Sequence, residues 1–103
     1  MTVRAVLDIT VTPGRADEFV TAWREVAAAV RTNPGNLRQS LVRDRDDPHR
    51  FLIMTDWADA DAFRRFETSP EQDDLTAGLR ELRQSARMTV YDLAHHVEGK
   101  EAT

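Results

Sequence analysis

Cysteine is absent from the 103 residues, and long uninterrupted apolar runs are absent as well. Without cysteine the chain has no disulfide, no thiolate nucleophile and no Cys-based zinc or iron–sulfur site. The apolar residues near the N-terminus alternate with polar ones, whereas a signal peptide needs a continuous apolar segment. No run approaches the roughly 20 apolar residues of a transmembrane helix. These absences predict a cytoplasmic protein that does not enter a membrane.

An excess of one charge is also lacking. The 14 basic and 18 acidic residues are mixed along the chain and give a net charge of -4. A nucleic-acid-binding domain usually carries a basic patch, and a protein that binds anionic membranes does so as well, so both partners are excluded. A chain of 103 residues has room for one domain, which we place at residues 1–97 with a polar tail at 98–103.

Hydrophobic periodicity predicts the secondary structure. Alternation of apolar and polar residues indicates strands, and apolar residues at helical spacing indicate helices. The predicted strands are residues 3–11, 36–43, 49–57 and 87–95, and the predicted helices are residues 13–31, 60–67 and a stretch after Ser69-Pro70. We expect Thr12 to cap the first helix and Asp59 the second. The order βαββαβ predicts an α+β, ferredoxin-like fold in which helices cover one face of a four-stranded antiparallel sheet.

The third predicted strand is apolar on both faces. Phe51 and Ile53 point one way, and Leu52 and Met54 point the other. Helices can cover only one face of the sheet, so the other face would expose an apolar patch. A second copy packed sheet against sheet would cover it, which predicts a homodimer. The alternative is that these residues lie at strand ends in partial contact with solvent.

The order of short motifs resembles the antibiotic biosynthesis monooxygenase (ABM) family. The motifs are Thr-Pro-Gly before the first helix, Asn-Pro-Gly-Asn-Leu-Arg-Gln-Ser-Leu, a polar turn with Asp-Pro, and Phe-Leu-Ile-Met-Thr-Asp-Trp before Ala-Asp-Ala-Asp-Ala-Phe. The resemblance covers residues 3–93. It implies a dimeric α+β barrel with a pocket between sheet and helices. It also implies oxidation of a phenolic, quinol or anthrone-type, polyketide-like aromatic by molecular oxygen without a cofactor. Some relatives instead degrade haem or act on small signalling molecules.

Trp57 is the residue that the resemblance carries over best. Its indole would form a flat apolar wall on which an aromatic substrate stacks, and its N–H could hold a substrate oxygen. The alternative is that Trp57 is only a large core residue. The residues expected to bind substrate around it are Phe51, Ile53, Phe63, Phe66 and Arg80.

Cofactor-free oxidation also needs a general base, because the substrate must lose a proton before it can reduce oxygen. The candidates are Asp56, His49, Asp8 and His95, since an apolar pocket would shift the pKa of an Asp or His toward that task. Tyr91 and Arg80 could orient substrate oxygens or stabilise the anion. The alternative for each of them is an exposed surface residue.

Several features of the family's motifs are missing. The His that many members carry nine residues after the Trp is replaced by Phe66, and Ile53 and Met54 stand where some oxygenases have Asn. Leu7 and Asp8 occupy the first-strand position of the Asn in haem-degrading relatives, and residues 60–86 contain no His, so haem degradation is disfavoured. These gaps leave a second hypothesis open, a non-redox polyketide cyclase or ligand-binding auxiliary protein of the same fold.

No metal site is predicted. The acidic turn at residues 44–49 lacks the Gly and Glu that an EF-hand loop requires at its sixth and twelfth positions. His95 and His96 are adjacent on a predicted strand and therefore point to opposite faces.

Overall fold

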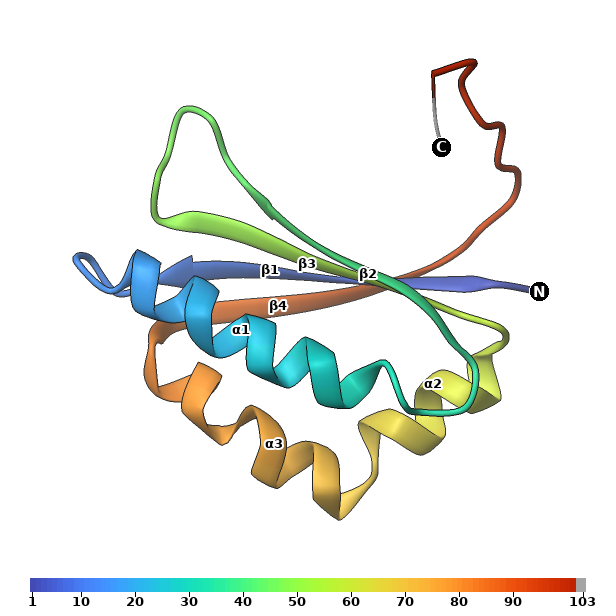
Figure 1. Ribbon diagram of the computed structural model, residues 1–103, viewed down its shortest axis with the longest axis horizontal. Helices are drawn as coiled ribbons and strands as arrows, with labels where there is room; N and C mark the ends of the chain where they lie inside the picture. Colours follow the sequence, from blue (N-terminus) through green and yellow to red (C-terminus); the bar gives the residue numbers. More distant parts are fainter. Residues whose placement is uncertain (102–103) are drawn as a thin grey trace.

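The two inner strands of the sheet are β1 and β3, each of which pairs antiparallel with a strand on both sides. The computed structural model describes residues 1–101 and gives the strand order β2-β3-β1-β4. The strands are β1 (Val3–Val11), β2 (Asn36–Arg43), β3 (Arg50–Trp57) and β4 (Arg83–Asp92). The helices are α1 (Ala16–Val30), α2 (Ala60–Glu67) and α3 (Pro70–Glu81), and all three lie on the same side of the sheet (Figure 1). The predicted ferredoxin-like fold is confirmed.

Strand alternation separates the two faces of the sheet. The odd-numbered residues of β1 face the helices and form two core clusters, one toward each end of the sheet. The first cluster consists of Val3, Ala5, Val30, Trp57, Ala62 and Phe63. The second consists of Ile9, Val11, Phe19, Phe51, Leu79 and Leu82. The helices pack on this face because their apolar stripes are buried there.

The residues that begin the helices confirm one predicted cap and correct another. Asp59 caps α2, its carboxylate accepting a hydrogen bond from the Ala62 N–H at 2.8 Å. The predicted cap of α1 at Thr12 is wrong, because α1 begins at Ala16 and has no side-chain cap. The segment between them forms a turn instead, with Gly14 at φ 82° and the Arg15 N–H bonded to the Thr12 carbonyl. Glycine tolerates this left-handed conformation, which a helical start would not need.

The last strand lies earlier in the chain than its periodicity predicts. It runs from Arg83 to Asp92 instead of over residues 87–95. Its start follows α3 directly: the Leu82 carbonyl accepts a hydrogen bond from the Thr12 N–H. Its end is fixed by β1, because the Leu93 N–H bonds to the Thr2 carbonyl and β1 offers no partner beyond that point. Pairing with the neighbouring strand therefore decided both ends.

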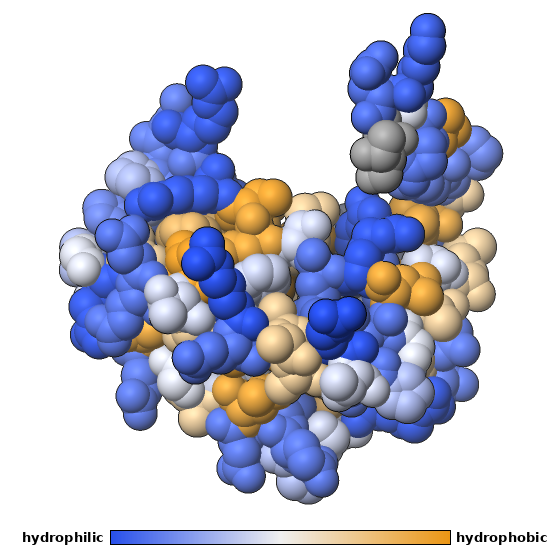
Figure 2. All heavy atoms as spheres, in the orientation of Figure 1, coloured by the Kyte–Doolittle hydropathy of each residue, from blue (hydrophilic) through white to orange (hydrophobic). Residues whose placement is uncertain are grey.

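In the part of the chain that the structure describes, the opposite face of the sheet carries no helix. The β2–β3 hairpin and the segment after β4 both rise on this side (Figure 1), and Figure 2 shows a hollow between them with apolar side chains near the base of the hairpin. Leu52 and Met54 lie on this face, opposite Asp8 and Val6 of β1. We call this surface the bare face. Among residues 1–101, no helix is long and apolar enough to cross a membrane.

Candidate functional site

A cavity of about 250 Å³ lies between the sheet and the helices, between the two core clusters. Its apolar walls are formed by Ala5, Leu7, Ile9, Ile53 and Met88 of the sheet and by Trp23, Val26, Val30, Phe63, Phe66 and Leu79 of the helices. Its polar lining consists of Gln39, Thr55, Glu67, Gln72, Thr76, Arg80 and Arg83. An apolar chamber with a few polar groups is typical of a small-molecule site.

Aromatic side chains form one end of the cavity. Phe63 and Phe66 come from successive turns of α2 and line the cavity directly. Trp57 lies behind them, stacked on Phe66 with ring centroids 4.9 Å apart. Its indole is fully buried, and its N–H donates a hydrogen bond to the Thr55 hydroxyl at 3.0 Å. Trp57 thus packs behind the aromatic wall, and its N–H is bonded to another residue of the protein.

A row of polar side chains from α3 forms another wall. Gln72, Thr76 and Arg80 are four residues apart and so share one helical face. The Arg80 guanidinium donates hydrogen bonds to the Thr76 hydroxyl at 2.8 Å and to the Asp73 carbonyl at 3.0 Å. Of these three residues, Arg80 alone is predicted from the sequence to bind substrate. The spacing of the other two was visible in the sequence, but a polar stripe on a helix usually faces solvent.

Arg83 reaches the cavity because of a β-bulge. Thr10 pairs with Ser85, but the next residue, Val11, pairs with Arg83, so β4 contributes one extra residue here. On a regular strand Arg83 would share the bare face with Arg87, and the bulge turns it toward the helices instead. Burial and the neighbouring charge of Arg80 lower the pKa of the Arg83 guanidinium from its usual value. An arginine nevertheless stays protonated near neutral pH.

Four of the five predicted substrate-binding residues lie together at this cavity. Ile53, Phe63, Phe66 and Arg80 line it. Phe51 does not, because it packs against Phe19 in the second core cluster with ring centroids 5.4 Å apart. β3 places Phe51 near its start, beyond the end of the cavity.

The predicted general base Asp56 lies on the other side of the sheet. Its carboxylate is buried on the bare face and accepts hydrogen bonds from Arg4 and Arg38, each with a shortest distance of 2.7 Å. The hydrogen bonds from Arg4, with the one from Arg38, hold the pKa of Asp56 below its usual value against the opposing effect of burial. A carboxylate that is paired and whose pKa is lowered is poorly suited to accept a proton from a substrate.

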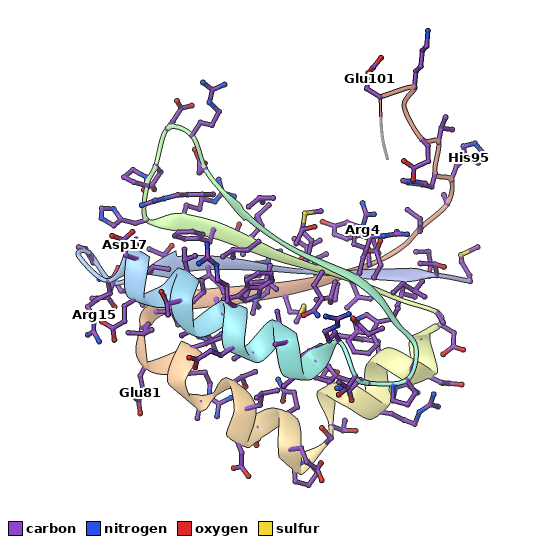
Figure 3. The ribbon with its side chains drawn as sticks, viewed as in Figure 1. Arg4, Arg15, Asp17, Glu81, His95 and Glu101 are labelled. Atoms are coloured by element: carbon purple, nitrogen blue, oxygen red, sulfur yellow. The ribbon has the colours of Figure 1, made fainter. Side chains whose placement is uncertain are left out.

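The other predicted catalytic residues also lie away from the cavity. His49 belongs to the β2–β3 turn, where it pairs with Asp47 at 3.7 Å. Tyr91 is about half exposed and lies opposite Arg4, so it shares the bare face. Figure 3 shows His95 on the segment that follows β4, far from the helices, and Asp8 pairs with Arg50 at 2.8 Å. Periodicity alone could not assign Tyr91 and Asp8 to a face of the sheet, and it placed His49 and His95 on strands that begin after the first and end before the second.

The charged groups that line the cavity are therefore few. They are Glu67 and the two arginines Arg80 and Arg83. Over residues 1–101 no cluster of three or more His, Asp or Glu side chains is placed to hold a metal ion. The arrangement can enclose a flat apolar molecule, exclude water from it and present positive charge to one part of it.

A four-stranded antiparallel sheet with helices on one face and an apolar cavity between the two layers defines a ferredoxin-like α+β domain. Within that class, the chain belongs to the antibiotic biosynthesis monooxygenase family, whose model matches residues 2–77. The resemblance seen in the sequence is confirmed.

Similar proteins come from Streptomyces. The crystal structure of SnoaB, a cofactor-independent oxygenase from Streptomyces nogalater, superposes with a TM-score of 0.84 at 28% identity, over 95% of this chain and 98% of that one. Deoxynogalonate monooxygenase from the same organism is 36% identical over 57 residues, which is 55% of this chain and 48% of that protein. A 42.8 kDa protein in the whiE locus of Streptomyces coelicolor is 25% identical over 94% of this chain and 24% of its own length. The matches thus span about half and about a quarter of these two curated relatives.

Proposed function

We propose that this protein is a cofactor-independent monooxygenase that oxidises a phenolic, quinol or anthrone-type intermediate of polyketide metabolism with molecular oxygen. The observation that carries the proposal is the partly open apolar cavity with an aromatic end and cationic groups. The similarity to SnoaB over nearly the whole chain supports it. The proposed substrate is a small aromatic compound, and the proposed location is the cytoplasm.

The proposed reaction requires the protein mainly to bind the substrate and to stabilise its negative charge. An anthrone loses a proton from its CH₂ group to give an electron-rich anion, which transfers electrons to oxygen. One oxygen atom becomes the new ring carbonyl and the other leaves as water, so that R₂CH₂ and O₂ give R₂C=O and H₂O. Arg80 and Arg83 would stabilise the anion, and the apolar walls would strengthen that attraction by excluding water. Glu67 is the one carboxylate in the lining and the proposed proton acceptor.

Oxygen uptake by metal-free protein supplied with an anthrone or a quinol tests the proposal. We expect turnover above the rate of spontaneous oxidation, with one molecule of O₂ consumed per molecule of anthrone. Thr76→Trp places an indole in the cavity and should abolish turnover. Asp74→Trp puts the same side chain on an exposed position of the same helix and should not. Uptake at the spontaneous rate across a panel of such compounds would contradict the proposal.

A second function is favoured by one observation: among residues 1–101, no His or Asp lines the cavity, which leaves Glu67 as its one candidate proton acceptor. A cyclase or binding protein that only folds or holds a polyketide-like chain depends on the shape of its cavity more than on a proton acceptor. Ligand binding raises the unfolding temperature of a protein by mass action whether or not the ligand reacts. Stabilisation by the ligand without oxygen uptake would therefore select this function.

We also propose that two copies pack through their bare faces. Val42 is 40% exposed and Tyr91 is 53% exposed on this face. Leu52 and Met54 add half-buried apolar surface between them. A symmetric partner would remove this surface from water.

A further inference from the structure

Arg83 is a partly buried cation in an apolar wall without an anionic partner. In residues 1–101 its guanidinium makes no hydrogen bond or ion pair with another residue. Arg4 and Arg50, by contrast, each pair with an aspartate at 2.7–2.8 Å. Withdrawing a charge from water is unfavourable unless a partner compensates it. The bulge in β4 therefore directs a positive charge into the cavity and leaves it uncompensated.

The charges around Arg83 also favour an anion at this end of the cavity. Arg80 lies close enough to Arg83 for their repulsion to affect the pKa of Arg83. Arg80 is itself only loosely balanced, because its ion pair with Asp73 is 3.6 Å long and the Asp73 side chain is 78% exposed. Glu67 is the single opposing charge in the lining, and it belongs to α2, at the aromatic end. The two ends of the cavity thus differ in chemistry.

From this arrangement we infer that the cavity selects an aromatic anion, whose acidic oxygen group binds Arg83 with support from Arg80 while its rings lie toward Phe63 and Phe66. The inference deepens the proposed function and rests on it for the identity of the site. The strand geometry sets the length of such a ligand. The stretch of β1 from Ala5 to Ile9, which forms the cavity floor, spans about 13 Å at ~3.3 Å per residue.

The size of the cavity restricts the ligand further. At about 250 Å³ it lies just below the roughly 300–1,000 Å³ of ordinary ligand pockets. A compact ring system carrying one acidic group fits these limits. The acidic group can be a carboxylate or an ionised phenol, because an arginine offers the same donors to both oxygens.

Binding measurements without turnover test the inference. The probes are 2-naphthoate and its neutral counterpart 2-naphthamide, titrated against the wild-type protein by calorimetry. We expect naphthoate to bind about tenfold more tightly, as one charge-assisted hydrogen bond provides. In Arg83→Gln this preference should disappear, with naphthamide affinity unchanged. Arg83→Lys should restore part of it, which also shows that position 83 tolerates substitution.

Arg87→Gln is the matched control. It removes an arginine from the same strand, but one that lies on the bare face opposite Asp8. The preference for naphthoate should survive this change. A nitro-substituted naphthol that ionises near neutral pH, measured on both sides of its own pKa, shows whether a phenolate is accepted as well as a carboxylate.

Equal affinity for charged and neutral probes in the wild-type protein, or binding of neither, would overturn the inference. So would a naphthoate preference that persists in Arg83→Gln. Oxygen uptake is a separate readout. A preference for naphthoate without oxygen uptake would support the anion site and contradict the proposed oxygenase activity. Oxygen uptake without a preference for naphthoate would support the oxygenase activity and contradict the anion site.

Discussion

Arg4 and Asp56 form a two-pronged ion pair on the bare face, with Nε–Oδ1 at 2.7 Å and Nη2–Oδ2 at 3.0 Å. The two residues face each other across β1 and β3, and Arg38 of β2 binds the same carboxylate at 2.7 Å. Figure 3 shows Arg4 pointing away from the helices. One buried carboxylate thus ties together three strands at the edge of the proposed interface.

We expect Asp56→Asn to lower the free energy of unfolding by about 2 kcal/mol, because the three charged hydrogen bonds to this buried group are lost or weakened while both arginines keep access to water. Asp8→Asn is the matched control on the same face. Its ion pair with Arg50 is 2.8 Å long but exposed, so its loss should cost much less. Urea denaturation of the three proteins measures both effects. Equal losses in the two variants would contradict the role given to Asp56.

The same carboxylate predicts a dependence on pH. Because the pKa of Asp56 is lower in the folded protein than in the unfolded chain, its stabilisation is complete above the unfolded value. It is lost as the pH falls from about 4 through the folded value. The stability difference between the wild type and Asp56→Asn should therefore shrink in acid. A difference that stays constant from neutral pH to about pH 2 would show that Asp56 is not the titrating group.

Gly35 and Gly14 have the same backbone conformation, with φ of 88° and 82°, but different surroundings. A Cβ atom on Gly35 would lie 2.6 Å from the Ala62 Cβ, whereas one on Gly14 would meet nothing within 4 Å. We expect Gly14→Ala to cost about 1–2 kcal/mol of stability from backbone strain alone. Gly35→Ala should cost about 1–3 kcal/mol more, through overpacking against α2.

Displacement of α2 would also move Phe63, which follows Ala62 and lines the cavity. Gly35→Ala should therefore weaken naphthamide binding as well as stability, and Gly14→Ala should not. Thermal melts and calorimetry check the two effects separately. Identical behaviour of the two variants would mean that the loop does not press on α2.

Periodicity was sufficient to predict the fold, because apolar alternation on strands and capping residues such as Asp59 act locally. The apolar part of the candidate site could also be predicted from the sequence, since aromatic residues on a short helix beside a strand end predict an apolar pocket. What periodicity could not assign was the face of the sheet on which candidates such as Asp56 and Tyr91 lie. Asp56 and Trp57 are neighbours on β3 and point to opposite sides, and only the pairing with β1 decides which side carries the helices.

Arg83 shows a second reason why part of the candidate site could not be predicted from the sequence. Its direction depends on a bulge in β4, and the strand there consists of Arg-Gln-Ser-Ala, with no glycine or proline to mark an irregularity. A strict two-residue period would place Arg83 with Arg87 on the bare face. The extra residue arises from pairing with β1, which is a long-range interaction that no local pattern reports.

The bare face gives a prediction about assembly. Leu52 and Met54 are now assigned to this face, so Leu52→Glu or Met54→Glu would bury an unpaired carboxylate in each protomer of the dimer. At roughly 3–5 kcal/mol for an uncompensated buried charge, dimerisation should weaken at least about a hundredfold. Leu37→Glu is the control, since Leu37 is an exposed apolar residue beside α1. Light scattering at micromolar concentration gives the mass, and a monomeric wild type would refute the dimer.

Trp57 gives the last prediction, which separates a binding residue from a supporting one. Because its N–H is already bonded to Thr55 and its ring is fully buried, we expect Trp57→Phe to act mainly on stability. The smaller ring leaves a void behind Phe66 and should cost about 1–3 kcal/mol.

Thr55→Val keeps the shape of the acceptor and removes its oxygen, so the indole N–H is left buried without a partner. This change should cost a similar amount, about 1–3 kcal/mol. Melting curves and naphthamide titrations of both variants then decide the matter. If Trp57 only supports the wall, both proteins melt earlier and bind the probe almost as the wild type does. A Trp57→Phe protein that keeps its stability but loses turnover or affinity would instead place the indole N–H in contact with substrate, and Thr55 would then be a partner that it gives up when substrate binds.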